Sequence, residues 1–130
     1  MTPWAKFQHS LAGHTVRIGR QDHSWIFQFA AGLNIRVESS WRIRNKERIL
    51  LTDGDDGQQF GLPARIDAEA AANDLLQGLE VQAIDEDGST ADLVIRFTGD
   101  LMLEVITNSS GYESWTAYVE SELAAVGRNP

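Results

Sequence analysis

The chain has 130 residues, 42% of them hydrophobic, and a formal net charge of −8. This length allows one domain with a single sizeable core, the four tryptophans argue against a disordered acidic segment, and the absence of cysteine excludes disulfides, thiolate catalysis and cysteine-bound zinc. No apolar run approaches the roughly 20 residues that span a bilayer, and the N-terminal residues lack the basic and apolar regions of a signal peptide, so we expect a cytoplasmic protein without a membrane partner.

The first half of the chain predicts a helix followed by strands. The pair Thr2-Pro3 is typical of a helix start, and Gly13 of a helix end. A short strand around residues 16–18 precedes a hairpin over residues 25–37. Apolar and polar side chains alternate in this hairpin, which indicates one buried and one solvated face. A further strand begins at Trp41.

The second half repeats this order after a polar connection. Residues 49–51 form a short strand or a buried turn, and residues 52–58 carry the strongest loop signal in the chain. The remaining predicted elements are a helix capped by Asp67 and ended by Gly78, a strand from Val81, a hairpin over residues 93–105, a strand over residues 115–119 and one or two helical turns over residues 120–126.

The two halves share a spacing of apolar residues. A shift of 68 positions places seven apolar residues of the first hairpin on apolar residues of the second. Upstream, a shift of 65 relates Leu11, Gly13 and Val16 to Leu76, Gly78 and Val81, and a shift of 74 relates Trp41 to Trp115. Alternation alone is common to all half-buried hairpins, but the ordered series of helix, glycine, strand, hairpin and tryptophan favours a repeat.

These observations predict an α+β fold in one domain over residues 1–130. A mostly antiparallel sheet would be built from two duplicated β-meander units, each preceded by a helix. The pseudo-repeats would cover about residues 2–45 and 67–119. Edge strands of short meanders expose unpaired backbone groups, so a homodimer is one expected outcome.

The charge is divided unevenly along the chain. Residues 1–65 carry a net charge of +3 and residues 66–130 a net charge of −11. Either the two halves pack so that their charges complement each other, or the acidic half forms a face for a basic partner. Direct nucleic-acid binding is not expected, because phosphate contacts need a clustered basic surface.

Known catalytic and metal-binding patterns are not matched. The loop that starts at Asp53 lacks the residues that an EF-hand needs at its fifth, sixth and twelfth positions. The spacing of His9, His14 and His23 fits neither a zinc finger nor a metalloprotease helix, although His14 and His23 could meet across adjacent strands as a two-ligand site. We predict no metal, no cofactor and no catalytic residue, and therefore no enzyme.

Two short segments are the candidate binding residues. Tyr112, Glu113 and Trp115 follow a flexible stretch and could line a pocket or an interface, or the two rings could close the core. The acidic residues Asp85, Glu86 and Asp87 either meet a partner or form a hairpin turn.

Some of these motifs resemble a known group of proteins. The Leu-x-Gly-x-x-Val pattern at Leu11, the apolar hairpin, and the Gly-Tyr-Glu-Ser-Trp motif ending at Trp115 are similar to a family of small uncharacterised bacterial proteins of unknown function. The similarity covers about Leu11 to Tyr118. It implies no established activity, cofactor or catalytic residue. Some small bacterial proteins with this style of closing motif also resemble toxin-neutralising immunity proteins.

The sequence therefore favours a non-enzymatic module that binds another protein or itself. One alternative is an immunity protein whose acidic half blocks a basic toxin. The other alternative is a small-molecule binder or enzyme that uses the segment from Tyr112 to Trp115.

Overall fold

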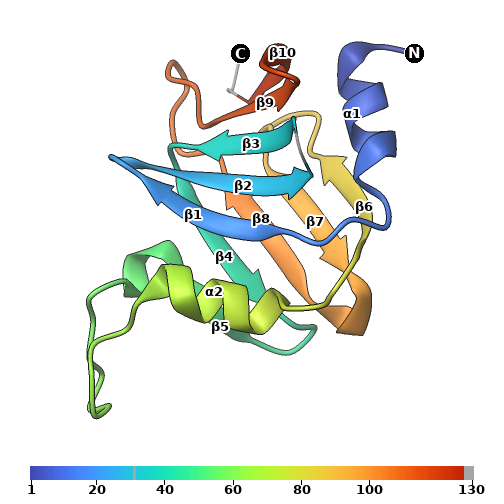
Figure 1. Ribbon diagram of the computed structural model, residues 1–130. Helices are drawn as coiled ribbons and strands as arrows, with labels where there is room; N and C mark the ends of the chain where they lie inside the picture. The colour runs from blue at the N-terminus through green and yellow to red at the C-terminus, as the bar shows by residue number, and fades with distance from the viewer. Residues whose placement is uncertain (31, 128–130) are drawn as a thin grey trace.

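The computed structural model describes residues 1–30 and 32–127, which form two five-stranded antiparallel sheets and two short α-helices (Figure 1). In spatial order the first sheet contains β1 (Arg17–Gln21), β2 (Ser24–Ala30), β3 (Leu33–Val37), β9 (Trp115–Val119) and β10 (Glu122–Gly127). The second contains β5 (Ile49–Thr52), β4 (Ser40–Arg44), β8 (Met102–Ile106), β7 (Leu93–Phe97) and β6 (Val81–Glu86). The helices are α1 (Pro3–Leu11) and α2 (Ala68–Leu76), with 3-10 turns η1 (Asp53–Asp55) and η2 (Thr98–Asp100). The predicted α+β fold with two meander units is confirmed.

Both helices begin and end at the predicted residues. Thr2 Oγ1 accepts a hydrogen bond from Ala5 N at 3.0 Å, and Asp67 Oδ1 accepts one from Ala70 N at 3.2 Å. These side chains satisfy backbone donors that have no partner inside the helix. Neither α1 nor α2 has the length and hydrophobicity of a membrane-spanning helix within the described residues.

The two halves of the chain, α1 with β1–β5 and α2 with β6–β10, pair their strands in the same register. Trp25 lies opposite Val37 as Leu93 lies opposite Val105, and the shift between these pairs is 68. The upstream shift grows from 65 to 66 inside β6, because the register of β6 slips between Val81 and Ala83. This bulge adds one residue that β1 does not have.

Each half contributes two strands to the sheet of the other half. Only Glu38 and Ser39 separate β3 from β4, but β4 leaves the first sheet and pairs with β8. In return β9 pairs with β3. Trp41 lies opposite Val105, and Trp115 opposite Val37, so the two tryptophans occupy equivalent places. Strands that change sheets at a corner are typical of orthogonally packed sheets.

The C-terminal segment corrects one expectation. Residues 120–126 were expected to form helical turns, but β10 pairs with β9 over Glu122–Gly127. Glu120 and Ser121 both have positive φ, 50° and 69°, and they form the two-residue turn between these strands. Two consecutive left-handed residues match the twist of a hairpin, which folds the chain back as a strand. Residues 49–51, predicted as a strand or a buried turn, lie in strand β5.

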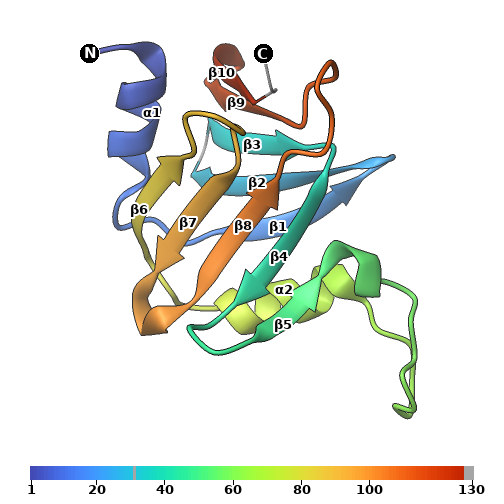
Figure 2. The ribbon, with the colours of Figure 1, turned by 180° about the vertical axis from the view of Figure 1, so that it is seen from behind.

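The core lies between the sheets, and the helices close its open sides (Figure 2). Helix α1 packs against β6, β9 and β10, whereas α2 packs against β1 and β5. Trp41 and Trp115 are each 1% exposed at the centre of this core. The ring of Trp115 lies 5.0 Å from the ring of Trp4 in α1 with the two planes tilted by 34°, and Trp41 meets Trp25 edge to face at the same centroid distance. Helix α1 of the first half thus covers edge strand β6 of the second half, and helix α2 of the second half covers edge strand β1 of the first half.

Candidate functional site

Three segments interrupt the correspondence between the halves. Asp22 and His23 alone join β1 to β2, whereas residues 87–92 join β6 to β7. Glu38 and Ser39 join β3 to β4, whereas residues 107–114 join β8 to β9. The third segment is the connection from β5 to α2. Because the shared strands serve as scaffold, binding residues are expected in these added segments.

The turn at residues 87–92 is organised by Asp87. Its carboxylate accepts hydrogen bonds from Ser89 N and Ser89 Oγ at 2.8 Å and from Thr90 N at 3.0 Å. These bonds to the ionised form lower the pKa of Asp87 to about 2. Asp87 is therefore a turn-forming residue, in line with the hairpin-turn reading of the acidic run.

The two acidic residues before this turn have different surroundings. Partial burial raises the pKa of Glu86, and a hydrogen bond with Trp4 opposes the shift. Asp85 Oδ2 lies 3.7 Å from Arg96 Nε on the exposed face of the same hairpin. Exposed pairs at this distance contribute little to stability. Asp85, Glu86 and Asp87 all remain at the surface.

The loop at residues 107–114 holds Tyr112 away from the protein. The ring is 84% exposed, although the Ser109 hydroxyl accepts hydrogen bonds from Gly111 N at 3.1 Å and Tyr112 N at 2.9 Å. Ser114, 2% exposed, anchors the end of the loop, where its carbonyl accepts from Glu38 N at 2.9 Å. An exposed tyrosine on an ordered turn offers a large apolar surface with a polar end.

Trp115 does not share a pocket with Tyr112. Its indole N–H donates to Ala91 O at 2.8 Å inside the core, so the side chain is not accessible to a ligand. The expectation that both rings close the core therefore holds for Trp115 and fails for Tyr112. Glu113 is exposed beside Tyr112. The three residues do not form a common binding pocket.

The two added segments of the second half are joined at their bases. Asp92 Oδ1 accepts a hydrogen bond from Thr107 N at 2.7 Å, and Trp115 links the same region to Ala91. Both segments lie at one end of the molecule, the upper end in Figure 1. We call residues 85–92 and 107–114 the acidic end, since they contain five acidic residues and no Lys or Arg. The structure thus brings the two candidate segments to one end of the fold.

Elsewhere the opposite charges of the two halves pair with each other. Glu104 of β8, 7% exposed, accepts from Arg42 Nε at 2.7 Å and from Arg44 Nε at 2.9 Å. Asp100 lies 3.6 Å from Lys46 at the far end of β7, away from the acidic end. The uneven charge along the chain is therefore partly neutralised inside the fold. The acidic end holds its carboxylates without Lys or Arg in its own segments, and one of them, Asp85, lies 3.7 Å from Arg96 of β7.

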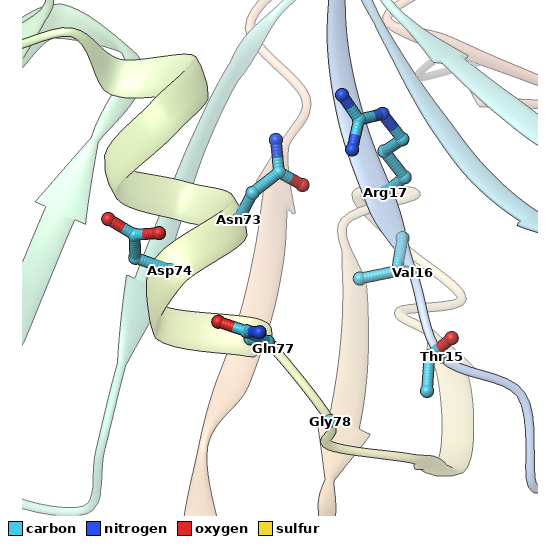
Figure 3. Close-up of a pocket in the computed structure, with 7 residues that line it drawn as sticks. All are labelled: Thr15, Val16, Arg17, Asn73, Asp74, Gln77 and Gly78. Carbon is cyan, nitrogen blue, oxygen red and sulfur yellow. The ribbon is translucent and has the colours of Figure 1, made fainter.

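A shallow groove runs between α2 and β1 (Figure 3). Asn73 points from the helix toward the strand, whereas Asp74 points away from it. The Asn73 amide both accepts from Ile18 N and donates to Ile18 O, each at 2.8 Å. These bonds tie the Asn73 side chain to the edge of the sheet. They give the groove a structural role.

The histidines do not meet. His14 precedes β1 and His23 follows it, so the two side chains lie at opposite ends of that strand. The expectation that His14 and His23 meet as a two-ligand metal site is therefore wrong. In the described part of the chain no three His, Cys, Asp or Glu side chains gather closely enough to hold a metal ion. The chain matches no protein-family model, no curated protein and no solved structure.

Proposed function

We propose that this protein is a non-enzymatic, cytoplasmic bacterial module that binds a basic protein through the acidic end. One observation carries the proposal. The two segments that the second half adds to the shared framework lie at one end of the fold, and they combine carboxylates with the exposed ring of Tyr112. Aromatic residues supply binding energy at interface centres, and surrounding charges increase the association rate.

The same surface supports the more specific alternative of an immunity protein. Such a protein would place Tyr112 and Glu113 against the basic active site of a toxin. The competing small-molecule function loses support, because Trp115 is buried and cannot line a pocket with Tyr112. The proposal therefore names a protein partner with a basic surface.

The test is a binding measurement with the basic products of neighbouring genes, by calorimetry at two salt concentrations. We expect Tyr112→Ala and Glu113→Lys each to weaken binding by tenfold or more, and higher salt to weaken it further. Asp100→Asn, at the other end of β7, is the matched control and should leave affinity unchanged. Equal binding by all three variants would reject the acidic end as the interface.

A further inference from the structure

The third added segment is a small hairpin that projects from the fold. Residues 57–66 leave the body of the protein between η1 and α2, as both views show (Figures 1 and 2). Two backbone hydrogen bonds close its base, from Gly57 N to Ile66 O at 2.8 Å and from Ile66 N to Gln58 O at 2.7 Å. At the tip, Leu62 N donates to Gln59 O at 2.8 Å, and the Gln59 side chain donates to Leu62 O at 2.9 Å. The hairpin is therefore an ordered element.

The root of the hairpin is fixed to the sheet. Asp56 Oδ1 lies 2.8 Å from Arg20 Nη2 and accepts from Ala68 N at 3.0 Å. These two contacts lower the pKa of Asp56, so its carboxylate stays ionised and bonded at neutral pH. The position of the tip is thus set in advance, which reduces the entropy lost when the tip binds.

The tip exposes apolar side chains from a strained backbone. Phe60 is 68% exposed and Leu62 is 48% exposed. Phe60 has a φ of 48° and Gly61 a φ of 76°, the pair of left-handed residues that a tight hairpin turn requires. Glycine suits this conformation better than a bulky aromatic residue does. Neither burial of the ring nor the geometry of the turn explains a phenylalanine at position 60, whereas a surface that receives the ring would explain it.

An apolar groove lies between α1 and β10. It has a volume of 250 Å³, enough for a phenyl ring, and its lining residues are Pro3, Lys6, Val119, Glu122, Leu123 and Ala124. Leu123 is 57% exposed there. The hairpin carries one charged residue, Arg65, and the groove offers Glu122 as its acidic partner. The apolar lining of the groove suits the apolar hairpin tip, and Glu122 has the charge opposite to Arg65, beside the like charge of Lys6.

A hairpin cannot enter the groove of its own chain. In both views the hairpin and α1 with β10 lie at opposite ends of the molecule (Figures 1 and 2). We propose that the 57–66 hairpin of one chain inserts Phe60 into the α1–β10 groove of a second copy, with Arg65 facing Glu122. A reciprocal exchange around a twofold axis fills both grooves and gives a closed dimer. This interface uses no residue of the acidic end, so it stands apart from the proposed function.

Sedimentation velocity of the full chain between 1 µM and 1 mM tests the proposal. We expect a dimer. Phe60→Gly should raise its dissociation constant by roughly tenfold or more, because the substitution removes the ring that the groove holds. The thermal midpoint of the same variant, measured at a concentration where both proteins are monomeric, should stay equal or rise, since glycine relieves the backbone. Ile49→Ala, which removes another exposed apolar side chain, is the matched control and should dimerise normally.

A charge exchange supplies a second, independent measurement. Arg65→Glu and Glu122→Arg should each weaken the dimer, and the double variant should recover at least part of the loss. A chain that stays monomeric throughout the concentration range overturns the proposal, even if the hairpin binds another protein. A dimer that is unaffected by Phe60→Gly overturns it as well, because the interface would then lie elsewhere.

Discussion

Asn73 binds the backbone of Ile18 as a neighbouring strand would. Its amide oxygen accepts from Ile18 N and its amide nitrogen donates to Ile18 O, both at 2.8 Å. In the other half Gln8 donates to Ile84 O at 3.1 Å. Gln8 and Asn73 are related by the shift of 65, and Ile18 and Ile84 by the shift of 66. A helix side chain thus covers an edge strand in both halves, which limits unwanted strand pairing at β1 and β6.

Replacing Asn73 should expose this edge. We expect Asn73→Ala to lower the free energy of unfolding by about 1–3 kcal/mol, because it leaves the polar groups of Ile18 without their partner. Gln8→Ala should cost about 0.5–1.5 kcal/mol, since it removes a single hydrogen bond. Urea titration measures both losses. Amide exchange of Ile18 should accelerate in Asn73→Ala, and unchanged exchange would contradict the strand-like role.

Phe29 and Phe97 should be equally important to the core. The two rings are related by the shift of 68 and are 5% and 1% exposed. Replacing either with alanine should cost about 3–5 kcal/mol, as is usual for a core aromatic residue. Tyr112→Ala is the surface control, because this ring is 84% exposed, and it should change stability by less than about 1 kcal/mol. A small loss for Phe29 alone would show that the halves differ in packing.

Gly127 lies directly under the indole of Trp115. A Cβ atom at this position would overlap the ring, which is held in place by Ala91 and Trp4. We expect Gly127→Ala to detach β10 or displace Trp115, with a loss of about 1–3 kcal/mol from overpacking. Gly111→Ala is the control, because its Cβ would meet open space. Near-ultraviolet circular dichroism should change in the first variant only.

The triad of Glu104, Arg42 and Arg44 should stabilise the contact between the halves. Glu104→Gln should destabilise the protein by about 1–3 kcal/mol, because the guanidinium groups of Arg42 and Arg44 would then lie close together without the negative charge that attracts both. Partial exposure of the arginines keeps the value below that of a fully buried pair. In contrast, Asp100→Asn breaks the exposed pair with Lys46 and should cost less than about 1 kcal/mol. Equal costs for the two variants would contradict this ranking.

Acid should weaken the turn at Asp87. Its pKa is about 2 in the folded protein, below the 3.8 of an unperturbed Asp, so the ionised carboxylate favours folding. This contribution is present above about pH 4 and is lost as the pH falls toward 2. Asp87→Asn should flatten the dependence of stability on pH in this interval. Ser89→Ala, which removes one donor, should raise the pKa of Asp87 in an NMR titration. A pKa that does not move would indicate that the turn is held by other contacts.

Local patterns predicted much of the fold. Alternation in residues 25–37 and 93–105 identified both hairpins, and the caps Thr2 and Asp67 identified both helix starts. Alternation states which side of a strand is buried, but it does not state which strand lies beside it. The exchange of β4 and β9 between the sheets therefore could not be predicted from the sequence. The β9–β10 turn was also missed, because Glu120 and Ser121 lack the Asn-Gly or Asp-Gly signal of a tight hairpin.

The candidate site was less predictable. The sequence identified the acidic run and the segment around Tyr112, but Trp115 was grouped with Tyr112 although the two point to the core and to solvent. Strand β9 begins at Trp115, which is buried, whereas Tyr112 belongs to the preceding loop and is exposed. Phe60 was overlooked because it follows the predicted loop of residues 52–58 and was assigned to no element. An aromatic residue immediately before Gly61 was the available signal.

The exchange of β4 and β9 also determines how the chain must fold. Neither sheet can be completed until residues more than 60 positions apart have met, as Trp41 and Val105 do. Non-local pairing of this kind slows folding, because the entropy of closing long loops must be lost before many contacts form. A ribosome would have to release the chain as far as Val119 before the first sheet acquires β9. The nascent first half would wait in an incomplete state, with the places of β9 and β10 unfilled.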